Sequence, residues 1–107
     1  LLNGYRASQL MPKQQLYIYK SYVMLGDIFF DEEKYNLASK AYERAIYISD
    51  TISRFYGQVG SDMRDIYTKV LKACMPTQPI HFKLIKCASN FNDIDRTEKY
   101  YEELRKS

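Results

Sequence analysis

Side-chain chemistry needs reactive groups within reach of one another, and this sequence offers few. His81 is the single histidine among 107 residues, so it is the only imidazole that could serve a serine or cysteine as a base. It follows Pro79, a position more typical of a helix start or a partly packed residue. The sequence therefore assigns no catalytic residue and indicates a protein that is not an enzyme.

Metal and cofactor sites are equally poorly supported by the residue types. Cys74 and Cys87, even together with His81, cannot supply the four ligands of a structural zinc site. The glycine pair in 57–60 lacks the following lysine and the preceding strand of a phosphate-binding loop. Carboxylates cluster at 31–33 and at 102–103, where a turn and a charged helix face explain them. We expect no metal, no cofactor and two reduced thiols that pack as small hydrophobes.

Charge and hydropathy narrow the classes of partner. The net charge is +3, from 16 basic and 13 acidic residues. These charged residues are interspersed along the chain, which does not predict a nucleic-acid surface. The nearest basic candidates are Lys69, Lys72, Lys83 and Lys86. No apolar run is long enough for a membrane span, and no basic-then-apolar signal segment opens the chain. We expect an intracellular protein, cytoplasmic or nuclear, that binds neither nucleic acid nor membrane.

The elements that must position these residues are all helical. Apolar residues recur with a period near 3.6, and no segment alternates long enough to predict a strand. The predicted helices cover 1–11, 13–30, 35–56, 61–74, 81–91 and 95–106, with turns at 31–34 and 90–93. Pro12 ends the first of them, and Pro76 with Pro79 closes the fourth. The sequence thus predicts an all-α protein.

Residues 19–50 carry the clearest pattern, two short helices packed back to back. Tyr22, Leu25, Gly26 and Phe29 share one face of the first helix. On the second helix Tyr35, Ala38, Tyr42 and Ala45 likewise share one face. We expect Gly26 to lie opposite Ala38, so that the two backbones approach closely while aromatic rings fill the space on either side.

This pattern resembles a tetratricopeptide repeat (TPR). The family carries an aromatic, Leu-Gly and another aromatic in its first helix, and Ala, aromatic, Ala in its second. Asp50 stands where the family has its helix-ending proline, so nothing obliges the second helix to stop there. The resemblance implies antiparallel helical hairpins stacked as a fragment of an α-solenoid. Residues 1–107 would form one domain of a longer chain, with a well-matched repeat at 19–52, an irregular part at 53–77 and a degenerate repeat at 78–107.

What the resemblance implies about function is protein–protein interaction. In that family the first helices line a concave groove that takes a peptide or a helix. The corresponding positions here are Lys20, Val23, Asp27, Phe30 and Asp31. Asp27 would repel a carboxylate terminus, so the groove suits an apolar or basic partner segment, with Phe30 as its anchor and the two aspartates as charge partners.

A narrower resemblance concerns the run DIFFDEEKYNLASKAYERAI at 27–46 and the unusually long second helix. Together they are similar to the N-terminal region of the TPR scaffold subunits of the anaphase-promoting complex, a cell-cycle ubiquitin ligase. This resemblance implies that the chain is a subunit of a multi-protein complex and that the subunit itself forms homodimers. Most of the eleven tyrosines are explained by packing, but Tyr5, Tyr17, Tyr47 and Tyr56 become candidates for self-association. The alternative is a helical accessory domain of an enzyme whose catalytic part lies outside these residues.

Overall fold

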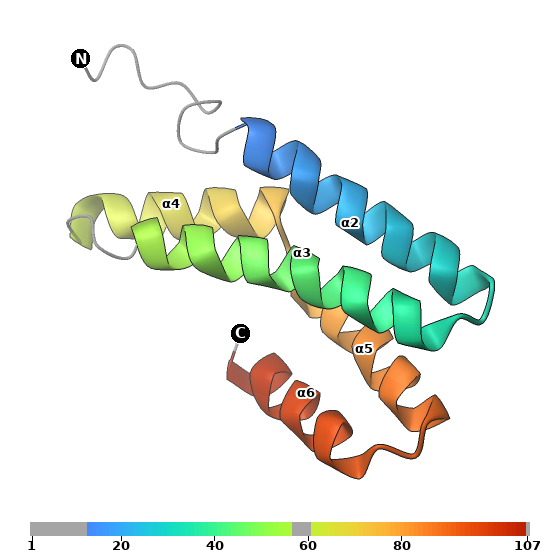
Figure 1. Cartoon of the computed structure of the whole chain (residues 1–107). Coiled ribbons are helices and arrows are strands. Elements are labelled where there is room, and N and C mark those ends of the chain that lie inside the picture. Colours follow the sequence, from blue (N-terminus) through green and yellow to red (C-terminus); the bar gives the residue numbers. More distant parts are fainter. Residues whose placement is uncertain (1–12, 57–60, 107) are drawn as a thin grey trace.

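The computed structural model describes residues 13–56 and 61–106. Over these ranges it contains helices and no strands, which confirms the all-α prediction (Figure 1). The helices are α2 (Lys13–Asp31), α3 (Tyr35–Tyr56), α4 (Ser61–Cys74), α5 (Gln78–Asn90) and α6 (Ile94–Lys106). The helix predicted at 1–11 lies outside the described residues.

Helix bounds follow the sequence closely, with one exception. α3 continues past Asp50 to Tyr56, as expected of a helix without a breaker. α5 begins at Gln78, three residues before the predicted start, and Pro79 lies inside its first turn. The prediction that Pro79 closes the preceding helix is therefore wrong. Proline has no N–H to donate, but the first turn of a helix needs none, so Pro79 opens a helix here.

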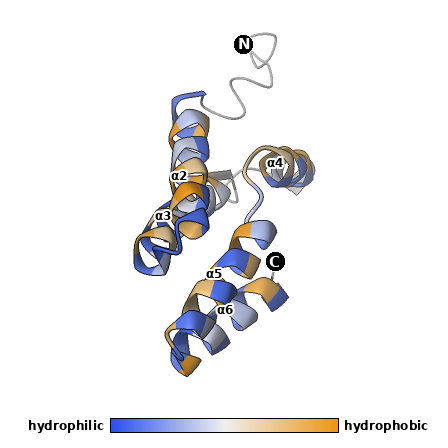
Figure 2. Cartoon of the chain, turned by 90° about the vertical axis from the view of Figure 1, so that its right-hand side faces the viewer, coloured by the Kyte–Doolittle hydropathy of each residue, from blue (hydrophilic) through white to orange (hydrophobic). Residues whose placement is uncertain are grey.

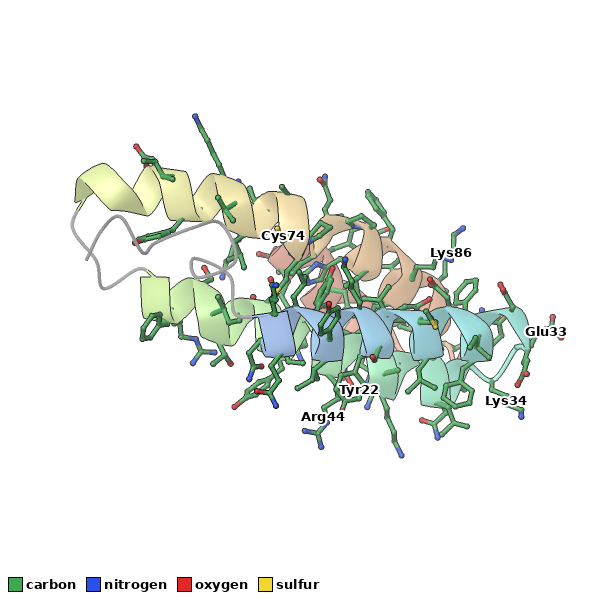
Figure 3. The ribbon with its side chains drawn as sticks, turned by 90° about the horizontal axis from the view of Figure 1, so that it is seen from above. Tyr22, Glu33, Lys34, Arg44, Cys74 and Lys86 are labelled. Atoms are coloured by element: carbon green, nitrogen blue, oxygen red, sulfur yellow. The ribbon has the colours of Figure 1, made fainter. Side chains whose placement is uncertain are left out.

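One turn geometry joins the helices of both hairpins. Between α2 and α3, Glu33 adopts a positive φ of 62°, and the N–H of Lys34 donates to the carbonyl oxygen of Phe29 at 2.8 Å. Between α5 and α6, Asn92 has a φ of 54° and the N–H of Asp93 donates to the Ala88 oxygen at 3.1 Å. Both are Schellman-type C-caps, in which a left-handed residue reverses the chain. Glu33 and Lys34 mark the tip of the first hairpin in Figure 3.

α3 lies at the centre of the molecule and contacts α2, α4 and α5, while α6 packs on α5. The fully buried side chains of α3 are Ala38, Tyr42 and Ala45. They join one core with buried residues of α2, α4, α5 and α6, among them Leu71, Leu84 and Tyr100. Because α3 contributes side chains to three packed surfaces, the two hairpins share a single core.

Three hydrogen bonds connect elements that are distant in the sequence. The hydroxyl of Tyr19 on α2 donates to the carbonyl oxygen of Pro76, in the segment between α4 and α5. Ser49 on α3 donates to the Met75 oxygen of the same segment at 2.9 Å. Tyr100 on α6 donates to a Glu43 carboxylate oxygen on α3 at 2.7 Å. α6, which lies against α5, is thus also bonded directly to α3.

The arrangement is elongated and open. Its principal extents are 50 × 25 × 15 Å, and its Cα radius of gyration is 15.2 Å, against about 13 Å for a compact domain of this length. Figure 2 looks along the long direction and shows α4 apart from the α2–α3 pair, with α5 and α6 below. In this arrangement one side of α2 and one side of α6 remain exposed, with large apolar side chains on both.

Candidate functional site

Gly26 on α2 packs directly against the ring of Tyr42 on α3. A Cβ added at Gly26 would meet the Cε1, Cδ1 and Cζ atoms of Tyr42 at 2.5, 2.6 and 2.9 Å. The sequence predicts Ala38 opposite Gly26, whereas the three atoms nearest to that Cβ position all belong to Tyr42. Ala38 is fully buried and completes the core nearby. The glycine is thus needed for an aromatic ring rather than for a second small residue.

Asp27 and Tyr42 form the next contact along this seam. The Tyr42 hydroxyl donates to Oδ1 of Asp27 at 2.5 Å, and Nζ of Lys83 on α5 lies 3.8 Å from the same oxygen. Burial raises the pKa of Tyr42 well above its usual range, and the hydrogen bond to Asp27 raises it further. Asp27 was predicted to serve a bound partner as a charge, but its carboxylate is bonded within the chain.

Phe30, the predicted anchor for a partner, is also occupied by intramolecular contacts. Its ring meets Tyr35 edge to face, with centroids 5.5 Å apart and an interplanar angle of 83°. Nζ of Lys83 lies 4.5 Å from the centroid of the Phe30 ring. Lys83 therefore links α5 to α2 through both Asp27 and Phe30. Sequence reasoning considered Lys83 only as a nucleic-acid candidate, because its partners lie more than fifty residues away.

The other predicted groove positions divide between core and solvent. Val23 is half-buried and packs against the core, while Lys20 and Asp31 are exposed. The predicted groove is thus not one continuous free surface. Three of its five residues, Val23, Asp27 and Phe30, help to hold the helices together.

A different face of α2 is exposed to solvent, and we call it the α2 crown. It is the row Gln14, Tyr17, Ser21, Met24 and Ile28, flanked on one side by Ile18 and Leu25. The large side chains are strongly exposed: Tyr17 by 65%, Met24 by 64%, Ile28 by 46% and Leu25 by 42%. Leu25, predicted to pack in the hairpin, lies at the edge of this face. Figure 2 shows how apolar residues recur along α2.

The signal for the α2 crown was present in the sequence. Crown positions repeat at intervals of three and four residues, which is the spacing of an apolar helix face. Residues 22, 25, 26 and 29 already account for one apolar face of this helix, the one predicted to pack in the hairpin. The second apolar face was therefore not predicted. A helix with two apolar faces buries only one of them in its own hairpin.

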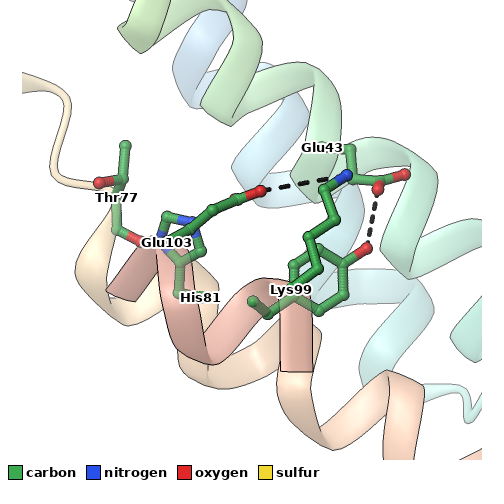
Figure 4. Close-up of polar contacts among 6 residues, drawn as sticks. Glu43, Thr77, His81, Lys99 and Glu103 are labelled. Atoms are coloured by element: carbon green, nitrogen blue, oxygen red, sulfur yellow. Dashed lines mark hydrogen bonds and ion pairs between the residues drawn. The ribbon is translucent and has the colours of Figure 1, made fainter. Parts of the chain in front are cut away.

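A second polar cluster lies where α5 and α6 meet (Figure 4). His81 is buried, with Nδ1 2.9 Å from the Thr77 carbonyl oxygen and Nε2 2.9 Å from Oε1 of Glu103. Both ring nitrogens thus lie within hydrogen-bond distance of an oxygen from a neighbouring residue. Lys99 lies 4.0 Å from the other Glu103 oxygen. His81 lies three residues inside α5 and bonds that helix to α6, which is a structural role.

This cluster borders an open pocket of about 360 Å³ that is lined by residues of α3, α4, α5 and α6. Its charged lining residues are Asp50, Lys72, Glu103 and Lys106. Burial raises the pKa of Asp50 above its usual value, and the charge of Glu103 raises it further. The negative charges of the two carboxylates are balanced by the positive charges of the two lysines. The pocket therefore has no pronounced preference for a positively or a negatively charged ligand.

The two cysteines and the tyrosines predicted for self-association differ in how exposed they are. Cys87 is buried, and burial raises its pKa, whereas Cys74 is half-buried; neither forms a disulfide in the structure. Tyr17 and Tyr47 are exposed on α2 and α3. Tyr5 lies outside the described residues, as does the side chain of Tyr56.

The described ranges contain no candidate metal-binding cluster and no candidate membrane-spanning helix. Across 13–56 and 61–106, no group of three or more His, Cys, Asp or Glu side chains could hold a metal ion. None of the helices described here combines the length and apolar character that crossing a bilayer requires. Comparison of the chain with protein-family models, with curated proteins and with solved structures found no match in any of the three.

Proposed function

We propose that this chain is a noncatalytic protein–protein interaction module built from TPR-like hairpins, and that it works as part of a multi-protein complex. The α2 crown carries the proposal. Tyr17, Met24 and Ile28 expose large apolar surfaces in one row along a well-formed helix. Contiguous apolar faces of this kind are characteristic of interaction sites, because isolated surface hydrophobes do not line up.

Three features support TPR-like stacking. Ala38, Tyr42 and Ala45, at the small–aromatic–small positions of the second helix, are fully buried. The two hairpins turn through the same Schellman-type cap. The first helix of the second hairpin packs on α3 and reaches α2 through Lys83, which is how successive hairpins of a solenoid make contact.

The second hairpin differs from the family pattern at residues 84 and 85. Leu84 and Ile85 are both buried, although the family prefers Leu-Gly there. A side chain as large as Ile85 in place of that glycine should keep the two helices of the second hairpin farther apart than α2 and α3. α4 then acts as an irregular insertion between two units, and we read 78–107 as a degenerate repeat.

The partner chemistry that suits the crown is an amphipathic helix. The row from Gln14 to Ile28 has no charged member, so apolar side chains at helical spacing on a partner would fit it. Membership of an intracellular ubiquitin-ligase scaffold is a narrower proposal that rests on the run at 27–46. The enzyme-accessory alternative stays a prediction, and a catalytic motif elsewhere in a longer chain would favour it.

Interaction is testable by quantitative affinity purification from cells that express the tagged protein. Met24→Glu places a charge in the middle of the crown, while Tyr101→Glu changes a side chain of similar type that is 51% exposed on α6. We expect the set of co-purifying proteins to be lost with Met24→Glu and kept with Tyr101→Glu. Equal recovery with both variants would contradict a role for the crown, provided circular dichroism shows both to be folded.

A further inference from the structure

The α2 crown has the spacing of a coiled-coil seam. Gln14, Tyr17, Ser21, Met24 and Ile28 follow one another at steps of three and four residues, as the a and d positions of two heptads do. Ile18 and Leu25 extend the seam on one flank. Such a seam is completed by a second helix that presents the same spacing.

The opposite flank carries a charge order that changes sign halfway along. Lys13 and Lys20 lie in the N-terminal half of α2, and Asp27 and Asp31 lie in its C-terminal half. All four occupy the same side of the helix, because they are separated by seven, seven and four residues. Lys13, Lys20 and Asp31 are exposed, and Asp27 is half-buried with a carboxylate oxygen toward Lys83.

We infer that the α2 crown binds the α2 crown of a second copy of this chain, with the two helices antiparallel about a two-fold axis. A two-fold axis reverses the direction of the partner helix but keeps its charged flank on the same side. The flank that runs plus, plus, minus, minus then meets one that runs minus, minus, plus, plus. In a parallel two-fold pair the charged flank of each helix would instead lie beside the partner's flank of Ile18 and Leu25, so its charges would have no partners of opposite sign.

The seam also fixes the register. When the axis passes between Tyr22 and Val23, Tyr17 lies opposite the partner's Ile28, and Ser21 lies opposite the partner's Met24. In that register Lys13 falls beside the partner's Asp31, within about one residue rise along the axis. Lys20 comes close to the partner's Asp27, about two residue rises away. The apolar contacts and the contact between Lys13 and Asp31 are thus satisfied by the same register, while Asp27 keeps its bond to Tyr42 within the chain.

The self-complementary charge order is what distinguishes a second copy from an unrelated helix. The contact area of one helix pair, on the order of 1,000 Å² in total, lies at the lower end of specific interfaces. We therefore expect a reversible dimer with micromolar dissociation. The inference deepens the proposed function, because it names the partner of the same surface.

Sedimentation equilibrium of the purified full chain, from about 1 to about 500 µM, measures the dimer directly. We expect a monomer–dimer equilibrium for the parent protein and for Tyr101→Glu, and a monomer at every concentration for Met24→Glu. A parent that stays monomeric throughout overturns the inference. If Met24→Glu then still loses co-purifying proteins from cells, the proposed function survives with a different partner on the crown.

Charge reversal tests the antiparallel order. Lys13→Glu and Asp31→Lys should each raise the dissociation constant by roughly fivefold to tenfold, since each acts at two symmetric contacts. The double variant should recover most of the parent affinity. Lys40→Glu, the same charge change at an exposed position of α3, is the control and should change little. Failure of the double variant to recover would exclude this pairing.

Cysteine cross-linking tests the register independently. Tyr17→Cys and Ile28→Cys chains, mixed and mildly oxidised, should form a mixed disulfide-linked dimer. Either variant alone should not, because the two symmetric copies of position 17 lie about 16 Å apart along the axis. The parent protein controls for Cys74. Efficient cross-linking of Tyr17→Cys with itself would indicate parallel helices and overturn the proposal.

Discussion

Gly26→Ala is the substitution that tests the central contact of the first hairpin most directly. The new methyl group would lie 2.5 Å from Cε1 of Tyr42, a distance that non-bonded carbon atoms do not tolerate. The ring cannot swing away freely, because Tyr42 is fully buried and its hydroxyl is bonded to Asp27. Either the ring moves and strains that hydrogen bond, or α2 and α3 move apart.

The magnitude follows from two opposing effects. Overpacking a buried contact costs about 1–3 kcal/mol, and loosening a hydrogen bond to a charged acceptor adds about 1 kcal/mol. Alanine in place of glycine inside a helix contributes about 1 kcal/mol in the stabilising direction. We therefore expect a net loss of about 1–3 kcal/mol in the free energy of unfolding. For a domain of this length, each kcal/mol lowers Tm by about 4–8 °C.

Urea unfolding followed by circular dichroism measures the loss, with Ser21→Ala as the control for helix propensity at an exposed position of α2. The clash itself is isolated by a double-mutant cycle with Tyr42→Leu, which shortens the opposing side chain. In that background Gly26→Ala should cost little or should stabilise, giving a coupling above about 1 kcal/mol. A Gly26→Ala protein as stable as its parent would refute the reasoning.

Three further substitutions follow from the described contacts. Asp27→Ala removes the acceptor of a buried tyrosine hydroxyl and should cost about 1–3 kcal/mol in urea unfolding, whereas Asp31→Ala should change stability by no more than about 0.5 kcal/mol; equal effects would contradict the bond. Glu33→Gly relieves a left-handed backbone position and should stabilise by about 0.5–1 kcal/mol, and a lower Tm would argue against that turn. The pKa of Asp50 is raised by burial and then by the charge of Glu103. The folded chain therefore binds the proton of the Asp50 carboxyl more tightly than the unfolded chain does, and ionisation of Asp50 lowers the free energy of unfolding as pH rises above about 3.8. Asp50→Asn should therefore raise Tm slightly near about pH 7 and leave it unchanged near about pH 3, and a gain of the same size at both would show another cause.

The sequence predicted the helices better than it predicted their contacts. Periodicity and the absence of a breaker were enough for the long α3, because helix formation there is a local property. The start of α5 was missed because a proline that ends one helix and a proline that begins another look alike in a sequence. In the structure the Met75 and Pro76 carbonyls, in the segment between the two helices, accept hydrogen bonds from α3 and α2.

The predicted groove shows where sequence reasoning ends. Spacing alone placed Asp27 and Phe30 on one side of α2, and that side does face another element. It could not show that Lys83, more than fifty residues away, occupies both residues. Long-range contacts decide which of two similar helix faces is free. The apolar residues of the α2 crown were visible in the sequence, but only the packing of α3 and α5 shows that they are left exposed.

The central position of α3 has a consequence for how the molecule opens. Since α2, α4 and α5 all rest on it, amide protons of α3 should exchange with solvent only when the whole structure unfolds, as in the most protected cooperative unit of a protein. α4 rests on α3 along one side through Leu71, and Asp65, Ile66, Thr68 and Lys69 face water. It is therefore the element able to detach and return while both hairpins stay folded, and its amides should exchange first.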